Sequence, residues 1–167
     1  MVAFFVFCQS LSAGGPWPWS PVLIAATANL FGPGASVLGN ELAMRFGRNR
    51  VVPVVMVCSG LCTCLFGLLS GMPWYAIVGL SFVMLSLHMG DSSALTAGMV
   101  VNSDPTMRGA SMALHSMLGF GAGFLAPLAF GAVLDAGGGN ANPTAWMLAY
   151  ASLGVLGVLA PLLLRLR

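Results

Sequence analysis

The sequence contains no lysine, and charged residues make up only 6% of its 167 positions. Soluble globular domains average about 25% charged residues. With 58% hydrophobic residues and a mean hydropathy of +0.93, the composition is that of a membrane protein. The net charge of +2 is small and forms no basic patch, so we expect no nucleic-acid partner.

Cysteine is also scarce, and its positions do not favour a metal site. Three of the four cysteines share one apolar run, with no histidine and no second paired cluster nearby: Cys8, Cys58, Cys62 and Cys64. A zinc site is therefore the weaker interpretation, and small, buried, thiol-bearing helix residues are the stronger one. We expect neither a metal nor a cofactor.

Apolar runs separated by short segments rich in Gly, Pro, Asn and Arg predict membrane-spanning helices. The predicted spans are 21–44, 51–71, 74–101, 109–134 and 145–165. The apolar run at 1–12 is too short to cross a core of about 30 Å. It is either a signal-peptide core or a partial helix, and the lack of a positive n-region favours the helix. We expect one all-α domain over 1–167, a polytopic membrane helix bundle.

Arginine predicts the orientation of these spans. All six arginines follow the first, third or fifth full span: Arg45, Arg48, Arg50, Arg108, Arg165 and Arg167. By the positive-inside rule that side, with the C-terminus, is cytoplasmic. The four tryptophans lie toward the other side, where an interfacial belt is expected: Trp17, Trp19, Trp74 and Trp146. We expect a multi-pass protein in the lipid bilayer of the plasma (inner) membrane.

The turn NELAMRFGRNR, residues 40–50, combines a helix end with closely spaced arginines. Gly47 can adopt positive φ there, and cations suit both a helix C-terminus and anionic lipids. Taken alone, the turn is a topology anchor. Arg45, Gly47 and Arg48 also resemble the loop signature G-x-L-A-D-R-x-G-R-R of the major facilitator superfamily. Met44 stands at its aspartate, which suits the degraded copy between the eighth and ninth helices.

Residues 103–131 resemble a second part of this superfamily. Asp104 is expected to cap a helix that begins at Pro105. The pair Arg108-Gly109 is similar to the Arg-Gly pair that opens the fifth and eleventh helices. Downstream, four residues recur every fourth position on one helix face: Gly119, Gly123, Pro127 and Gly131. This spacing predicts a close-packing helix surface with a proline bend.

The resemblance implies the C-terminal half of a transporter, from the end of helix seven through helix twelve, with the first helix truncated. Such transporters resemble two six-helix bundles that face each other across a central cavity. The implied partners are a small-molecule substrate and a missing N-terminal six-helix half, encoded by the same gene or supplied by a second copy.

The segment LSLHMGDSSALTAG, residues 85–98, places two ionisable groups inside an apolar span, Asp91 and His88. At 100° per residue, Ser92 and Thr96 fall on the same broad helix face. An ionised carboxylate at mid-bilayer costs at least about 2.5–3.5 kcal/mol, so this face must meet protein, water or substrate. It is either a hydrogen-bond network that joins helices or a pathway for substrate and protons.

Two further residues are candidates for such a pathway. His115 lies near the start of the fourth full span, where a helix-interface histidine is the commoner interpretation. Asn29 belongs to a polar patch of small residues in the first full span, and ordinary helix packing explains that patch equally well.

We therefore predict a secondary active transporter of a small solute, proton-coupled and present as a C-terminal fragment, and not an enzyme. One alternative is an intramembrane metal-dependent enzyme that uses His88, Asp91 and His115. No HExxH or Gly-x-Ser-x-Gly motif accompanies those residues. The other alternative is a non-transporting membrane scaffold, or a homodimer that mimics two halves.

Overall fold

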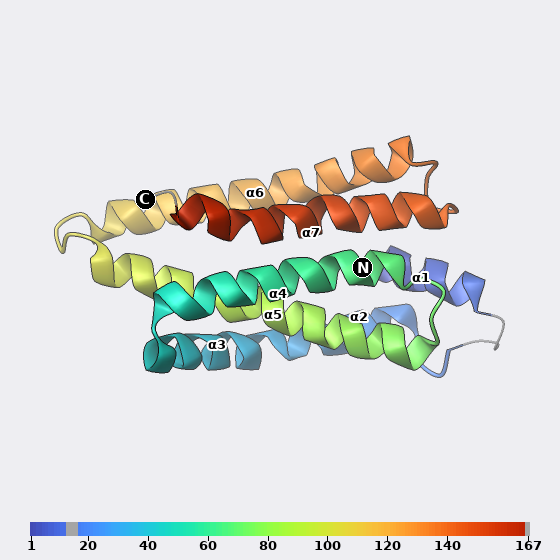
Figure 1. Cartoon of the computed structure of the whole chain (residues 1–167), viewed down its shortest axis with the longest axis horizontal. Helices are drawn as coiled ribbons and strands as arrows, with labels where there is room; N and C mark the ends of the chain where they lie inside the picture. The colour runs from blue at the N-terminus through green and yellow to red at the C-terminus, as the bar shows by residue number, and fades with distance from the viewer. Residues whose placement is uncertain (13–16, 166–167) are drawn as a thin grey trace.

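The computed structural model describes residues 1–12 and 17–165 (Figure 1). Every regular element in that part of the chain is an α-helix, which confirms the predicted all-α class. The helices are α1 (Val2–Leu11), α2 (Pro21–Leu30), α3 (Gly32–Phe46), α4 (Arg48–Leu68), α5 (Trp74–Asn102), α6 (Arg108–Ala136) and α7 (Pro143–Arg165). Two parts of the sequence-based predictions lie outside the described residues. They are residues 13–16, in the turn before the first full span, and Arg167, one of the six arginines used to predict the orientation.

Five stretches are long and apolar enough to cross a membrane: α2 with α3, α4, α5, α6 and α7. Successive spans run in opposite directions along an elongated bundle (Figure 1). We call one end the arginine end, because the α3–α4 turn with Arg48 and the α5–α6 loop before Arg108 lie there. The α4–α5 and α6–α7 turns form the opposite, tryptophan end. The chain is a multi-pass membrane protein.

The first full span is broken where a single helix was predicted over 21–44. It consists of α2 and α3, which meet at Phe31, and α3 continues to Phe46. Pro33 lacks the N–H that the carbonyl of Asn29 would otherwise accept. The N–H of Phe31 instead donates to the Ala28 carbonyl, 3.3 Å away, which tightens the last turn of α2. The break therefore has a local cause in the sequence.

The prediction that a helix begins at Pro105 is wrong. Asp104 closes a single turn, in which the Met107 N–H donates to the Asp104 carbonyl at 2.9 Å. Helix α6 begins after this turn, at Arg108. The carboxylate of Asp104 is occupied by the backbone N–H and the hydroxyl of Thr106. Its side chain thus stabilises the loop that precedes the helix.

Two pairs of helices touch through their backbones. In the α4–α7 pair, a Cβ placed on Gly60 would lie 2.6 Å from the Gly154 carbonyl oxygen. In the α3–α5 pair, a Cβ on Gly39 would collide with the backbone of Gly90. A larger side chain at Gly39 or Gly60 would push its helix pair apart. Small residues thus allow the close approach of helices that have no hydrophobic driving force within lipid.

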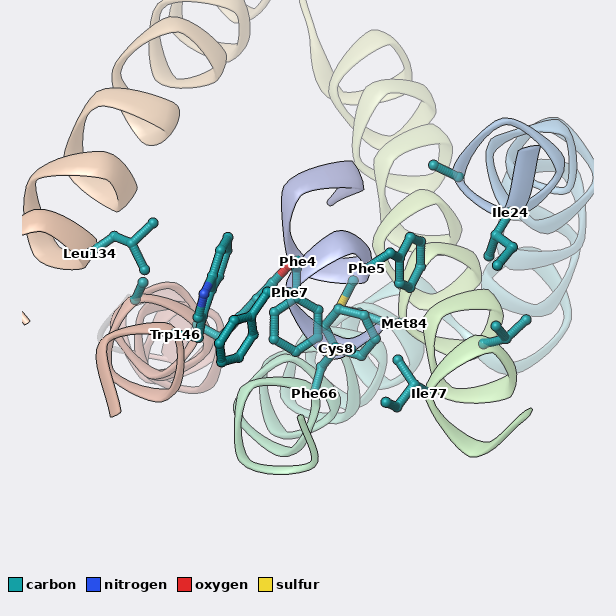
Figure 2. Close-up of a cluster of buried hydrophobic side chains, with 14 of the residues drawn as sticks. Phe4, Phe5, Phe7, Cys8, Ile24, Phe66, Ile77, Met84, Leu134 and Trp146 are labelled. Atoms are coloured by element: carbon teal, nitrogen blue, oxygen red, sulfur yellow. The ribbon is translucent and has the colours of Figure 1, made fainter. Parts of the chain in front are cut away.

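The short helix α1 forms the centre of an aromatic core. The ring centroid of Phe4 lies 4.8 Å from that of Phe66 on α4 and 5.3 Å from that of Trp146 on α7. Phe5 points to the opposite side, toward Met84 of α5 (Figure 2). The run at 1–12 is therefore packed inside the bundle and joins three of its helices.

Two of the four tryptophans are buried inside the protein. Trp146 is only 2% exposed, and its indole N–H donates to the Asn140 carbonyl at 2.8 Å. Trp17 is also buried, and its N–H donates to the Ser12 hydroxyl. Trp19 alone is more than half exposed, at 51%. Trp146 and Trp17 therefore satisfy their N–H groups within the protein.

The cysteines pack mainly as apolar residues. Cys8 and Cys62 are buried in the aromatic core, as expected. Cys64 is half-buried against α7, but Cys58 is exposed on α4, so the expectation of burial is wrong there. No group of three or more His, Cys, Asp or Glu side chains in the described ranges converges as a metal site would.

Candidate functional site

The candidate polar residues lie on the arginine-end half of α5, where they continue the helix face that carries Ile77 and Met84 beyond the aromatic core. The buried face of α5 presents Ile77, Ser81 and Met84 to the aromatic core and, farther along, Gly90 to α3. The polar residues of the same half, His88, Asp91, Ser92 and Thr96, are half-buried or exposed. The sequence-based expectation of a shared face on one helix therefore agrees with their partial exposure.

His88 is held by two hydrogen-bonding groups on the same ring nitrogen. Its Nδ1 lies 2.9 Å from the Met84 carbonyl oxygen and 3.0 Å from the Ser59 hydroxyl of α4. A carbonyl oxygen only accepts, so Nδ1 carries the proton and donates. In the neutral ring, Nε2 is then left with its lone pair. The imidazole is oriented from α4 and retains a free proton acceptor.

Asp91 lies three residues after His88, so the two side chains are neighbours on the helix surface. The carboxyl group is half-buried, and no described Arg, Lys or His nitrogen lies within 4.0 Å of it. The arginines of the described helices lie in their end turns. Asp91 therefore has no fixed counter-charge among the described residues, which leaves it able to exchange a proton or contact a cation.

The structure brings His115 of α6 to the polar face of α5. Its Nε2 lies 3.3 Å from the Thr96 hydroxyl oxygen. Thr96 donates its own hydroxyl proton to the Ser92 carbonyl, 2.9 Å away. The oxygen of Thr96 thus accepts from Nε2–H, and Nδ1 of the neutral His115 ring keeps its lone pair. A bond across two spans joins the polar residues of α5 to α6.

Asn29 is not brought to this cluster. Its amide donates to the Ala25 carbonyl of its own helix at 2.8 Å, and its side chain is exposed on α2. A hydrogen bond between this span and α5 is instead made by Ser93, whose hydroxyl donates to the Ser36 carbonyl of α3.

Sequence reasoning missed Ser59 and Ser93. Ser59 is buried on α4 beside the glycine that contacts α7, and it is the partner of His88. The available signal was weak, because a serine in a spanning helix usually bonds to its own backbone.

His88, Asp91 and His115 do not form the metal-ligand set of the enzyme alternative. The described part of the chain holds no convergent group of three such side chains. Nδ1 of His88 is committed to a carbonyl, and Nε2 of His115 to a hydroxyl. The geometry is that of a polar seam between helices.

Comparison with known proteins finds one similar transporter. No family model matches the chain, and no solved structure matches it. The chain is 32% identical over 134 residues to the uncharacterized MFS-type transporter YfnC of Bacillus subtilis (strain 168). The match covers 80% of this chain, which spans about a third of its relative, 31% of that protein's length. Over most of its length the chain is thus similar to a transporter of the major facilitator superfamily (MFS) type.

The loop with the superfamily signature forms the α3–α4 turn. Gly47 has φ +90°, a backbone conformation that favours glycine, and it separates the two helices. Arg45 pairs with Glu41 one helical turn earlier, with Nε 2.7 Å from Oε1. Arg48 extends toward Gly98 of α5, and its Nε is buried without a hydrogen-bond partner in the described structure. The signature arginines therefore have different surroundings.

The glycine stripe on α6 is open in the described structure. A Cβ placed on Gly119, Gly123 or Gly131 would meet no described atom within 4 Å. Pro127 lies inside the helix between the last two of them. The side chains flanking the stripe are exposed, as at Phe120, which is 81% accessible. Close packing on this face remains a prediction, because no described atom lies against these glycines.

Proposed function

We propose that this chain is the C-terminal six-helix half of a proton-coupled secondary transporter of a small solute. The observation that carries the proposal is the polar seam of α5 and α6, two helices that are long and apolar enough to cross a membrane, in a chain similar to a transporter. Asp91 and the free Nε2 of His88 are one helical turn apart, and His115 is linked to α5 through Thr96. Titratable groups inside a membrane bundle mark ion and proton pathways.

The proposed roles follow from these surroundings. Asp91 takes up and releases the coupling proton, because it lacks a fixed counter-charge. His88, oriented by Ser59, shares that proton through Nε2. Ser92 and Thr96 contact the solute or its water, and Asn29 contributes from the opposite wall once the bundle is complete. The described arginines of the spans lie in their end turns, away from the seam, so a cationic or neutral solute suits this half better than an anionic one.

The proposal also includes the rest of the transporter. An N-terminal six-helix half would cover the open faces of α5 and α6, which have few partners in this chain. We place the arginine end and the C-terminus in the cytoplasm of a plasma-membrane protein, on the positive-inside rule. Thiol labelling of an Asn102→Cys variant from inside, and of a Gly139→Cys variant from outside, would support this orientation. The reverse pattern would reject it.

Transport by the complete gene product in proteoliposomes tests the role of Asp91. Asp91→Asn removes the titratable group and keeps its shape, so it should abolish accumulation driven by a proton gradient. Exchange of solute without a gradient should persist. Asp135→Asn, at the tryptophan end of α6, is the matched control and should retain coupling. Undiminished gradient-driven accumulation in Asp91→Asn would reject the proton role.

A further inference from the structure

Two hollows adjoin at the arginine end and share residues. The first has a volume of about 570 Å³ and lies at the α3–α4 turn, where Arg48, Asn49 and Arg50 face Asn102 of α5. The second is a groove of about 510 Å³ between α4 and α7. Asn49 and Arg50 line both hollows. They therefore stand at the mouth of the groove.

The body of the groove is apolar. Beyond Asn49 and Arg50 it is lined by Pro53, Val54, Val57, Cys58, Val158 and Pro161. The two helices touch at Gly60 and Gly154, one or two turns farther from the arginine end. Each proline is inside its helix and lacks a backbone N–H. The groove is therefore the space left where the two helices no longer touch through glycine.

The mouth carries positive charge that the protein does not neutralise. Arg45 is paired with Glu41, whereas no described carboxylate lies within 4.0 Å of Arg48 or Arg50. The buried Nε of Arg48 also lacks an acceptor in the described structure. A cation removed from water without a partner is costly, so these groups favour an anion at the mouth.

An occupant must match both parts of this surface. Inorganic phosphate would satisfy the arginines but leave the apolar groove uncovered. A neutral lipid would fill the groove and leave the arginines unpaired. An anionic phospholipid supplies a phosphate for the guanidinium groups and an acyl chain for the valines, and arginine at the membrane surface attracts such headgroups.

We propose that the α4–α7 groove binds one anionic phospholipid. Its phosphate accepts hydrogen bonds from Arg50 and Asn49, and Arg48 adds charge from the adjoining hollow. One acyl chain lies along Val54, Val57 and Val158. The lipid fills the space between α4 and α7 where their glycine contact ends.

The test uses the whole chain purified in mild detergent and titrated with phosphatidylglycerol. Native mass spectrometry should show one tightly retained lipid per chain, and phosphatidylcholine with the same acyl chains should bind at least about tenfold more weakly. The exposed Cys58 thiol lines the groove. Alkylation of this thiol, measured by peptide mass spectrometry, should be slower in the presence of phosphatidylglycerol. It should not be slower in about 10 mM inorganic phosphate.

Matched variants separate the groove from general surface charge. Arg50→Gln should weaken phosphatidylglycerol binding about tenfold, while Arg108→Gln, at the same end of the bundle, should not. Val57→Phe should block the acyl chain without changing charge, while Val155→Phe on α7 should leave it bound. If Arg50→Gln does not fold, Arg50→Lys and Val57→Phe decide the question.

Four results would overturn the proposal. Equal binding of phosphatidylcholine would mean an uncharged lipid groove. Equal losses in Arg50→Gln and Arg108→Gln would mean diffuse attraction to charge. Protection of Cys58 by phosphate alone would mean a free-anion site. Unchanged binding in Val57→Phe would likewise exclude the groove as the place of the acyl chain.

Discussion

Thr96 on α5 and His115 on α6 form a hydrogen bond between two spans, with the hydroxyl oxygen 3.3 Å from Nε2. The two helices otherwise have few contacts, and α6 is the least buried of the five spans. A single polar bond is therefore a large share of what fixes α6 against α5. It also determines which nitrogen of His115 is free for proton exchange.

Removing either partner of this bond should loosen α6. We expect Thr96→Val and His115→Phe each to lower the free energy of unfolding by about 0.6–1.7 kcal/mol, the range for hydrogen bonds between membrane helices. The double variant should lose less than the sum of the two, because they share one interaction. Unfolding in sodium dodecyl sulfate, followed by tryptophan fluorescence, gives these values.

Thr27→Val is the matched control for Thr96→Val. The Thr27 hydroxyl donates only to the Leu23 and Ile24 carbonyls of its own helix. Its loss should leave the stability nearly unchanged. Fully additive effects of Thr96→Val and His115→Phe would show that the two side chains do not interact.

Glycine at the α4–α7 contact should be far less replaceable than glycine on α6. Gly60→Ala places a methyl group against the Gly154 carbonyl, so we expect a loss of about 1–3 kcal/mol. Gly119→Ala meets no described atom within 4 Å and should be neutral, or stabilise the helix by up to about 1 kcal/mol. The same unfolding measurement compares them.

In a complete transporter, the effect of Gly119→Ala should depend on what the α6 stripe contacts. If the α6 stripe packs against another helix there, Gly119→Ala should become destabilising, while Gly60→Ala stays destabilising in both contexts. A neutral Gly119→Ala in the complete transporter would mean that the stripe faces lipid or the cavity.

Asp104 gives a pH prediction for the α5–α6 loop. The hydroxyl and backbone N–H of Thr106 donate to its carboxylate and lower the pKa of Asp104 below its ordinary value. Because the folded pKa is depressed, this contribution to stability is complete above about pH 4, the unfolded pKa. It is lost as the pH falls through the lowered pKa.

Thr106→Ala should raise the pKa of Asp104 toward its ordinary value, and Thr106→Ser, which keeps the hydroxyl, should not. Carbon NMR of the labelled Asp104 carboxyl across the acid range measures both. An identical titration in Thr106→Ala and Thr106→Ser would show that the hydroxyl has no part in the shift.

The fold was predictable to the extent that it depends on local composition. Long apolar stretches form helices in lipid because every backbone polar group must be satisfied within the segment. The break at Phe31 was not predicted, although Pro33 supplies its cause. The span predicted at 109–134 matches α6 closely, but the helix start proposed at Pro105 was too early, because the local preference of Asp104 and Pro105 for a helix start gave way to a single turn.

For the candidate site, the sequence by itself determined that Asp91 and His88 share a face of one helix, since the angle per residue is fixed by helix geometry. It also determined that such a face must avoid lipid. Only the tertiary structure decided that Ser59 orients His88, that His115 reaches Thr96 and that Asn29 stays apart. Those contacts depend on how separate helices approach, and that approach is fixed by backbone contacts such as Gly60 with Gly154, which no local pattern specifies.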